Sequence, residues 1–462
     1  MIHSIHGILA SIFVWCLLPI LWAFYIVFDK IFRFLPINID PRVEALSKTS
    51  NFTICKTLYS KGLLTDKQYE YEKNVFNETD KEVIIGYTYL ILPITLYLQN
   101  HNQFDWLLRF IVLRVFQPAH GNQSKKLAIF MYFARNLGTS INKAKTTMLW
   151  LADRGVIQVI SVISPVFVVG TLMLAEPNLY QYIGTAFATI FTLLFVESLG
   201  NGLEVRYKKS DGMVYVGAIT LIAAYILTMG AMCVYGLSWE LMFLLGNAAI
   251  LIGSLGYPIV HELAHRKDKT SKTLYSILSY ILLMPTFKIF HNKGHHKDLV
   301  GVAASDEVVA DYNESIHTYL LRQVLHTSKK GYHLAKGEYL RLRAIEASIV
   351  LGLYVVNPLM ALAAVTIQIY AFLILETINY VEHFSLAQED NPRDRSVDSI
   401  NLLMNHSFFN VGYHSHHHTN PTVKHYSLEA KSKYITSYGY ISQFYMAYLP
   451  GTWEAHQQSL RG

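Results

Sequence analysis

The sequence predicts an all-α integral membrane protein with a histidine-rich metal site. Of its 462 residues, 52% are hydrophobic and only 16% are charged, whereas a soluble domain carries about 25% charged residues. Uncharged stretches of twenty residues or more recur along the chain, and about 20 apolar residues let a helix cross a bilayer. The net charge of +6 comes without a dense run of lysine and arginine, so it indicates the basic loops of a membrane protein and not a nucleic-acid surface.

Residues 1–150 are predicted to form an N-terminal extension with at least one transmembrane helix. Gly7–Phe28 is uncharged, and the start of the chain lacks the features of a cleaved signal, so this segment is expected to be a retained anchor. A polar stretch follows, then an apolar segment, Val83–Leu98, and an amphipathic one, Asp105–Phe116. At the other end, residues 431–462 are expected to form a short polar tail. The three scattered cysteines indicate neither a disulfide framework nor a cysteine metal site.

Residues 151–430 are predicted to form the main domain, which begins with two helical hairpins. Ile157–Ala175 pairs with Tyr182–Val196 across a turn that contains proline, and Met213–Tyr235 pairs with Leu241–Val260 across a short turn. The turns contain no lysine or arginine, whereas the open ends of both hairpins carry basic residues. Because basic loops stay on the cytoplasmic side, the open ends are expected to face the cytoplasm, or the matrix in a mitochondrion.

An interfacial helix and a third hairpin are expected to complete a six-helix bundle. Leu274–Phe287 has 14 uncharged residues, which are too few to cross a bilayer, so it is expected to be interfacial or re-entrant. A longer uncharged stretch of 29 residues, Ala347–Leu375, contains Asn357-Pro358, a natural turn. Residues 340–383 are then long enough for two legs. A single kinked helix is the alternative for this region.

Histidines gather in four short clusters in the main domain. "HELAH" follows the span that ends at Val260, and its two histidines, at positions i and i+4, share one helix face. "HNKGHH", "NYVEH" and "YHSHHHTN" are the others, and the hairpin topology places all four on one side of the membrane. Neutral imidazole is the commonest metal ligand. Because one zinc needs only four ligands, eight or nine histidines are expected to enclose two metal ions, and imidazole alone does not select the metal.

The sequences "HELAHRK", "HNKGHH", "NYVEHFSL" and "HSHHHTNPTVKHYSL" resemble the histidine motifs of the membrane-bound alkane monooxygenases, or alkane hydroxylases. That family lies within the integral-membrane fatty acid desaturase and hydroxylase superfamily. The resemblance covers residues 151–430 and implies a di-iron site that faces the cytoplasm. The ligands that it implies are His261, His265, His291, His295, His296, His383, His414, His417 and His418. The candidates to orient these rings are Glu262, Asn379, Glu382 and Asn420.

The chain departs from the family's motifs at several positions. His416 stands where the family usually has aspartate, and it is left out of the ligand set. Phe290 stands where a glutamate usually precedes the second motif, and Phe384 and Ser385 replace the usual tyrosine and glycine after His383. Metal binding is expected to survive these changes. Substrate choice, electron delivery and activity are where we expect them to matter.

The resemblance implies O2-dependent oxidation of an alkyl chain, such as an alkane or a fatty acyl lipid, with hydroxylation favoured over desaturation. It implies two irons as cofactor and an electron donor such as rubredoxin, ferredoxin or cytochrome b5. Two other interpretations stay open from the sequence. One is an integral-membrane HExxH zinc protease, with Glu262 as general base. The other is a non-enzymatic or degenerate membrane subunit of a larger complex, built on the same scaffold.

Overall fold

The structure, a computed structural model, is mostly helical and divides into two units, Met1–Trp150 and Leu151–Gly462. It describes residues 30–32, 35–43, 59, 66, 70, 139–175, 194, 196–204, 211–235, 237–300, 309–312, 314–386, 389–448 and 452–461. The predicted anchor Gly7–Phe28, the two segments expected after it and most of Tyr182–Val196 lie outside the described residues.

In the first unit, two described segments contact each other. The backbone N–H of Asp40 donates to the hydroxyl of Thr146 at 3.1 Å, and the ammonium group of Lys143 donates to the carbonyl of Leu35 at 2.8 Å. Residues 139–150 are helical, so these two hydrogen bonds attach the preceding chain to a helix.

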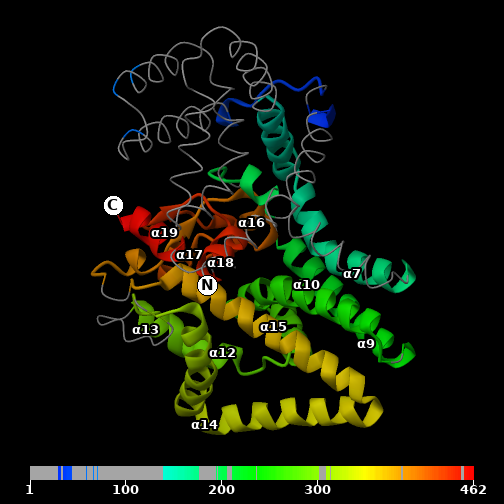
Figure 1. Ribbon diagram of the computed structural model, residues 1–462. Helices are drawn as coiled ribbons and strands as arrows, with labels where there is room; N and C mark the ends of the chain where they lie inside the picture. Colours follow the sequence, from blue (N-terminus) through cyan, green and yellow to red (C-terminus); the bar gives the residue numbers. More distant parts are fainter. Residues whose placement is uncertain are drawn as a thin grey trace, which may run out of the picture. The chain divides into compact units, whose positions relative to one another are not determined.

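The second unit contains the helices and strands that position the histidines (Figure 1). In chain order they are α7 (Val156–Ala175), α9 (Gly212–Val234), α10 (Trp239–Ala264), α11 (Lys269–Ile281), α12 (Phe287–Phe290), η1 (His291–His295), α13 (His296–Val300), α14 (Ile316–Val356), α15 (Pro358–His383), η2 (Pro392–Arg395), β1 (Asp398–Ser399), α16 (Leu402–Ser407), α17 (His414–Thr419), η3 (His425–Ser427), β2 (Ile435–Thr436), α18 (Tyr440–Tyr448) and α19 (Thr452–Arg461). The strands β1 and β2 pair in parallel.

Four helices in the described part of the chain are long and apolar enough to cross a membrane. They are α7, through its segment Val156–Met173, α9, α10 and α15, with mean hydropathies between 1.7 and 2.2. The chain is therefore a membrane protein, as its composition predicts. Two further membrane helices were expected in the six-helix bundle. The one before Asn357 is the second half of α14, and the other, Tyr182–Val196, lies mostly outside the described residues.

The predicted break at Asn357-Pro358 is confirmed, and two helices replace the alternative of one kinked helix. α14 ends at Val356, and α15 begins at Pro358. The side chain of Asn357 accepts a hydrogen bond from the N–H of Leu359 at 2.9 Å and caps α15. Proline suits the first helical position because its missing N–H would have no partner there.

α14 also bends sharply within its length, as Figure 1 shows. Ala335 has non-helical dihedral angles, φ −158° and ψ 61°, and it joins two helical segments. Only the segment after this bend leads into the Asn357 turn, so it is this half of α14 that forms a hairpin with α15.

The helices approach closely where small residues meet. At Gly253 of α10, a Cβ would lie 3.0 Å from the backbone N and 3.2 Å from the Cα of Ala371 in α15. The side-chain amide of Asn357 donates to the carbonyl of Met232, near the end of α9, at 3.1 Å. The Asn357 turn therefore lies at the end of the bundle where α10 begins. The first and third histidine motifs lie at the opposite end, where α10 and α15 finish.

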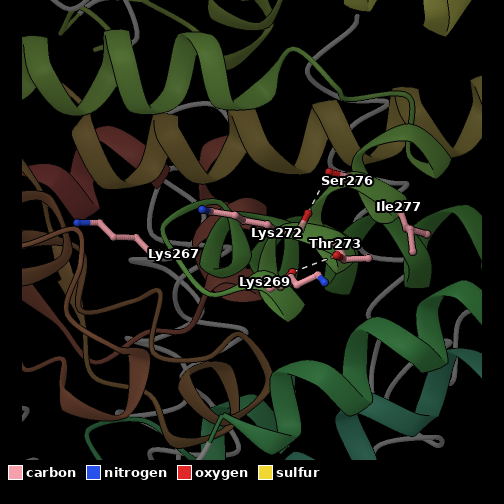
Figure 2. A pocket seen from close by; sticks show the side chains of 6 residues that line it. All are labelled: Lys267, Lys269, Lys272, Thr273, Ser276 and Ile277. Carbon is pink, nitrogen blue, oxygen red and sulfur yellow. Dashed lines mark hydrogen bonds between the residues drawn. The ribbon is translucent and has the colours of Figure 1, made fainter.

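The predicted interfacial segment, Leu274–Phe287, overlaps a short amphipathic helix, α11, which begins earlier, at Lys269, soon after α10 ends. The side chain of Asp268 caps α11 by accepting from the N–H of Ser271 at 2.8 Å. Figure 2 shows the exposed face of the helix, where a surface pocket of about 520 Å³ is lined by Lys267, Lys269, Lys272, Thr273, Ser276 and Ile277. The three lysines at the start of this face suit a membrane surface that carries anionic lipids.

Candidate metal centre

All nine histidines that the motifs single out lie in two adjoining groups. The first group is His261, His265, His291, His296 and His417, and the second is His295, His383, His414 and His418. Within each group, one ligand atom per residue lies within 4.8 Å of all the others. The rings of His296 and His418, one from each group, have centroids 4.5 Å apart. Residues up to 157 positions apart in the chain thus share one site.

The membrane helices α10 and α15 bring the first and third motifs to the site. His261 lies in the last turn of α10, and His265 is its C-cap, so the expected shared face of "HELAH" is present. Their ring centroids are 5.1 Å apart. His383 is the last residue of α15. The packed helices α10 and α15 thus supply three of the nine rings from their C-terminal ends.

The second motif forms a π-helix, η1. A π-helix widens the turn to i→i+5 hydrogen bonds and is frequent at functional sites. The backbone N–H of His296 accordingly bonds to the carbonyl of His291, five residues earlier. His291 and His296 thus enter the first group, and His295 enters the second. This local widening lets one short segment serve both groups.

The fourth motif also divides between the groups. The i, i+3 and i+4 spacing of His414, His417 and His418 places them on one face of α17, but His417 belongs to the first group and the other two to the second. His416 lies in neither group; it is partly exposed, and its Nδ1 accepts from the N–H of Glu429 at 3.2 Å. Leaving His416 out of the ligand set agrees with this position.

The buried carboxylate of Asp398 in β1 holds α17 in place. It accepts the backbone N–H of Ser415 at 2.9 Å and the hydroxyl of Ser415 at 2.5 Å. It also accepts the N–H groups of Lys431 at 2.6 Å and Ser432 at 2.8 Å. Burial raises the pKa of Asp398, and these hydrogen bonds oppose that change. Asp398 therefore links the helix that carries three of the nine histidines to the chain before β2.

The spacing of the ring nitrogens fits two metal ions. Nε2 atoms are separated by 3.1 Å between His291 and His296, 3.2 Å between His296 and His417, 3.1 Å between His383 and His414, and 2.8 Å between His414 and His418. Imidazole nitrogens bind zinc at about 2.0–2.1 Å, so two ligands of one such ion lie about 3.0 Å apart at a right angle and about 3.4 Å apart at the tetrahedral angle. The Nε2 atoms of His261 and His265 have no hydrogen-bond partner among the described residues, which also fits metal binding.

The protonation of the rings suits the same role. Burial, followed by the neighbouring histidines, lowers the pKa of His291, His296, His414, His417 and His418 well below the usual value. Burial lowers the pKa of His265 to about 4. Neutral imidazole is the form that binds metals. These rings are therefore ready to bind a metal at neutral pH.

Of the four residues expected to orient the rings, two reach the site's polar surroundings. Glu382 lies 3.1 Å from Nε2 of His414. Glu262 forms an ion pair with Arg266 and accepts the N–H of His425 at 3.2 Å. Through its contact with His425, Glu262 connects α10 to the segment that follows the fourth motif.

The other two candidates make contacts of a different kind. The amide of Asn379 donates to Glu376 at 3.2 Å, within α15. Asn420 is exposed, and its amide donates to the hydroxyl of its neighbour Thr419 at 3.4 Å. Neither contact is with one of the nine rings.

Sequence reasoning did not find three residues that support the site. Nδ1 of His383 lies 2.9 Å from the carbonyl of Arg395, which favours the proton on Nδ1, and Nε2 of His383 faces the group, 3.1 Å from Nε2 of His414. Asp398 and His425 are the others, and each acts through chain segments distant in sequence. The residues between Arg395 and Asp398, which are Ser396 and Val397, give no sign of such contacts in the sequence.

The departure at Ser385 has a backbone consequence. Ser385 has φ +55°, in the left-handed region that favours glycine. This explains in physical terms why glycine suits the position. The preceding Phe384 is buried and packs edge-to-face on Trp453 of α19 at 5.6 Å, so the segment expected as a polar tail supports the end of α15.

Comparisons with known proteins agree with the motifs. Residues 237–449 match the fatty acid desaturase family. The chain is 27% identical over 224 residues to Alkane 1-monooxygenase 1 of Alcanivorax borkumensis, which covers 43% of this chain and 55% of that protein. It is 24% identical over 287 residues to Alkane 1-monooxygenase 2 of Pseudomonas aeruginosa, covering 54% and 74% of the two chains. It is 26% identical over 282 residues to Alkane 1-monooxygenase 2 of Alcanivorax borkumensis, covering 54% and 71%.

The chain thus spans about half the length of the first of these relatives and about 70% of the other two. The residues of this chain that match the family, 237–449, include all nine grouped histidines. On this basis the chain is similar to the alkane 1-monooxygenases, and its residues 237–449 carry the match to the fatty acid desaturase family.

Proposed function

We propose that this protein is a membrane-embedded di-iron oxidase that uses O2 and two electrons to hydroxylate an alkyl chain. The nine grouped histidines are the proposed ligands. The overall reaction converts R–H, O2, two electrons and two protons into R–OH and water. A bound pair of irons would supply the O2 activation and the oxidation of the C–H bond. The electrons would come from a small redox protein, and the site is proposed to face the cytoplasm or the mitochondrial matrix.

The single observation that carries this proposal is the presence of two adjoining groups of histidines, five in one and four in the other, which are all buried except for the half-buried His265. Each group has enough nitrogen donors for its own ion, and neutral imidazoles suit iron as well as zinc and copper. A single structural zinc needs four ligands and leaves the second group without a role. Two ions explain both groups together.

The residues beside the rings favour an apolar substrate. The ring of Phe287 stacks on His291 at 4.6 Å, and the ring of Tyr257 stacks on His261 at 5.7 Å. Both aromatic residues are fully buried and hold water away from this side of the first group. We expect an alkyl chain dissolved in the bilayer to approach the ends of α10 and α15 from the apolar side. The relatives named alkane 1-monooxygenase support an alkane as one substrate.

The protease interpretation fits the structure less well. A general base must be available to a water molecule on the metal. Glu262 is instead paired with Arg266, which also pairs with Asp211 at 2.7 Å. In addition, the two histidines of "HELAH" share their group with three further histidines, and no carboxylate is in that group. Hydrolysis of a peptide has no use for the second group of four.

Turnover by the purified protein tests the proposal. The protein in detergent is loaded with Fe(II) without oxygen, mixed with a reducing system and a medium-chain alkane, and exposed to O2. We expect the primary alcohol by mass spectrometry, with an oxygen atom that comes from 18O2. His417→Ala and His418→Ala remove one ligand from each group and are expected to lower the rate at least about 100-fold.

His416→Ala is the matched control, because His416 lies on the same helix between the two but belongs to neither group. Its rate is expected to stay within about twofold of the unmodified protein. If the iron-loaded protein forms no oxidised product from alkanes or from fatty acyl lipids, the enzymatic proposal fails and the non-enzymatic subunit takes its place. Equal rates in all three variants contradict the assignment of the two groups.

A further inference from the structure

Two adjoining hollows on the surface around α11 are lined by lysine side chains. The first is the pocket of about 520 Å³ shown in Figure 2, which Lys267, Lys269 and Lys272 line. The second, of about 280 Å³, is lined by Lys288, and Ser276 of α11 lines both hollows. We propose that this lysine cluster, made of Lys267, Lys269, Lys272 and Lys288, binds the phosphate group of an anionic membrane phospholipid. The inference goes beyond the proposed function, since it involves neither metal nor oxidation.

The charges of the lysine cluster are not neutralised within the part of the chain that the structure describes. The acidic side chains close to it have other partners. Asp268 caps α11 by accepting from the N–H of Ser271 at 2.8 Å. Glu338 lines the second hollow and pairs with Lys293 at 3.1 Å. A concave surface with several charges of one sign attracts ions of the opposite sign, so an anionic group is the expected occupant.

The fourth lysine, Lys288, connects the two hollows electrostatically. It is half-buried, and its ammonium group lies over the ring of Tyr275 at 5.4 Å. Burial, followed by the charge of Lys272, lowers the pKa of Lys288. The charge of a lysine in the first hollow thus reaches the lysine in the second. One anion bound near both ammonium groups stabilises their charged forms.

The lysine cluster lies where the chain leaves the membrane. The membrane helix α10 ends at Ala264, and Lys267 follows three residues later. The next helix, α11, has 13 residues and is amphipathic. Its Leu278 is buried in the core, whereas Ile277 is 41% exposed and lines the first hollow beside the lysines. Basic side chains next to a membrane helix bind anionic headgroups, and an exposed apolar side chain beside them suits the acyl chains.

A phospholipid fits this surface better than an acidic redox protein does. Lipids of the surrounding bilayer are always within reach of the end of α10, whereas a soluble protein must first be captured from dilute solution. The exposed side chain of Ile277 also offers an apolar contact that a charged protein surface does not use. On the orientation proposed for the metal site, the lysines meet the cytoplasmic leaflet, which carries the anionic lipids of a cell membrane.

The test measures lipid binding by the full-length protein, as purified in a nonionic detergent. Phosphatidylglycerol or phosphatidylcholine is added in steps, and native mass spectrometry counts the bound lipids. We expect one phosphatidylglycerol to bind at least about 10-fold more tightly than phosphatidylcholine, because each lysine near an anionic lipid contributes about fivefold. Lys272→Gln with Lys288→Gln should abolish this preference, and Lys272→Arg with Lys288→Arg should keep it. Inorganic phosphate at the same concentration should not displace the lipid.

The matched control is Lys329→Gln with Lys336→Gln, which removes two exposed lysines that line neither hollow. If the first pair of variants does not fold, Lys267→Gln with Lys269→Gln tests the same cluster at exposed positions and should weaken phosphatidylglycerol binding at least about 10-fold. An unchanged lipid preference in the variants of the cluster overturns the proposal, as does an equal loss in the control. Loss of binding to an acidic ferredoxin, with the lipid preference intact, also overturns it and identifies a protein docking surface.

Discussion

Replacement of Asp398 by asparagine is expected to weaken both metal sites although Asp398 is not a ligand. Its carboxylate accepts three backbone N–H groups and one hydroxyl, and it thereby holds α17. That helix supplies His417 to the first group and His414 and His418 to the second. A loss of order at α17 therefore reaches both groups at once.

The magnitude follows from the count of donors. An asparagine amide has one oxygen that accepts about two hydrogen bonds, and its NH2 group is itself a donor. At least two of the four donors around position 398 then lose their acceptor. An unsatisfied buried donor costs about 1–3 kcal/mol, so we expect a loss of about 2–6 kcal/mol. At about 2 °C per kcal/mol, the Tm falls by about 4–12 °C.

Thermal unfolding of the detergent-solubilised protein measures this change, together with iron content by elemental analysis. Ser415→Ala is the control, because it removes the hydroxyl contact with Asp398 at 2.5 Å and the longer contact of the Lys431 N–H with that hydroxyl at 3.2 Å, and it leaves the three N–H bonds to Asp398. It is expected to lower the Tm by about 2 °C. If Asp398→Asn unfolds at the temperature of Ser415→Ala and retains both irons, the account of α17 is wrong.

Three further outcomes are expected. Burial lowers the pKa of His265 to about 4, and likewise the pKa of His406 and His456 to about 4, from an ordinary value of 6.5. A lowered pKa means that these rings contribute to the stability of the folded state above pH 6.5 and lose that contribution as the pH falls toward 4. The Tm of metal-free protein should therefore drop between pH 6.5 and 4 and stay constant from pH 7 to 8. Deletion of Lys293 should turn η1 into a regular helix and lower the iron content below one per chain. Lys293→Ala loses only a surface ion pair with Glu338 at 3.1 Å, so this variant should keep two irons per chain. Ser385→Gly should raise the Tm by about 2 °C, because glycine tolerates φ +55°, and an unchanged Tm in differential scanning would show that no strain is present there.

The arrangement of the membrane helices was largely predictable because hydropathy and turn residues are local signals. The limits of α9 and α10 lie within a few residues of the uncharged segments, and Asn357-Pro358 marks the break between α14 and α15. Convergence of the four motifs was predictable for a similar reason. Once basic loops set the topology, all four motifs fall at one end of the bundle.

The division of the histidines between two groups was not predictable from spacing. His295 and His296 are neighbours in sequence but enter different groups, because η1 has the turn of a π-helix. Nothing in "HNKGHH" distinguishes this turn from a regular one. Likewise, the acceptors around the site come from the carbonyl of Arg395 and from Asp398, and their roles depend on tertiary contacts.

Iron and zinc content per chain of the purified protein, measured by elemental analysis, tests the central claim most directly. Two irons per chain, both lost when His417 and His418 are replaced together, are the result expected from five and four converging imidazoles. A single zinc per chain, or two irons that remain in this double variant, would contradict the paired metal centre.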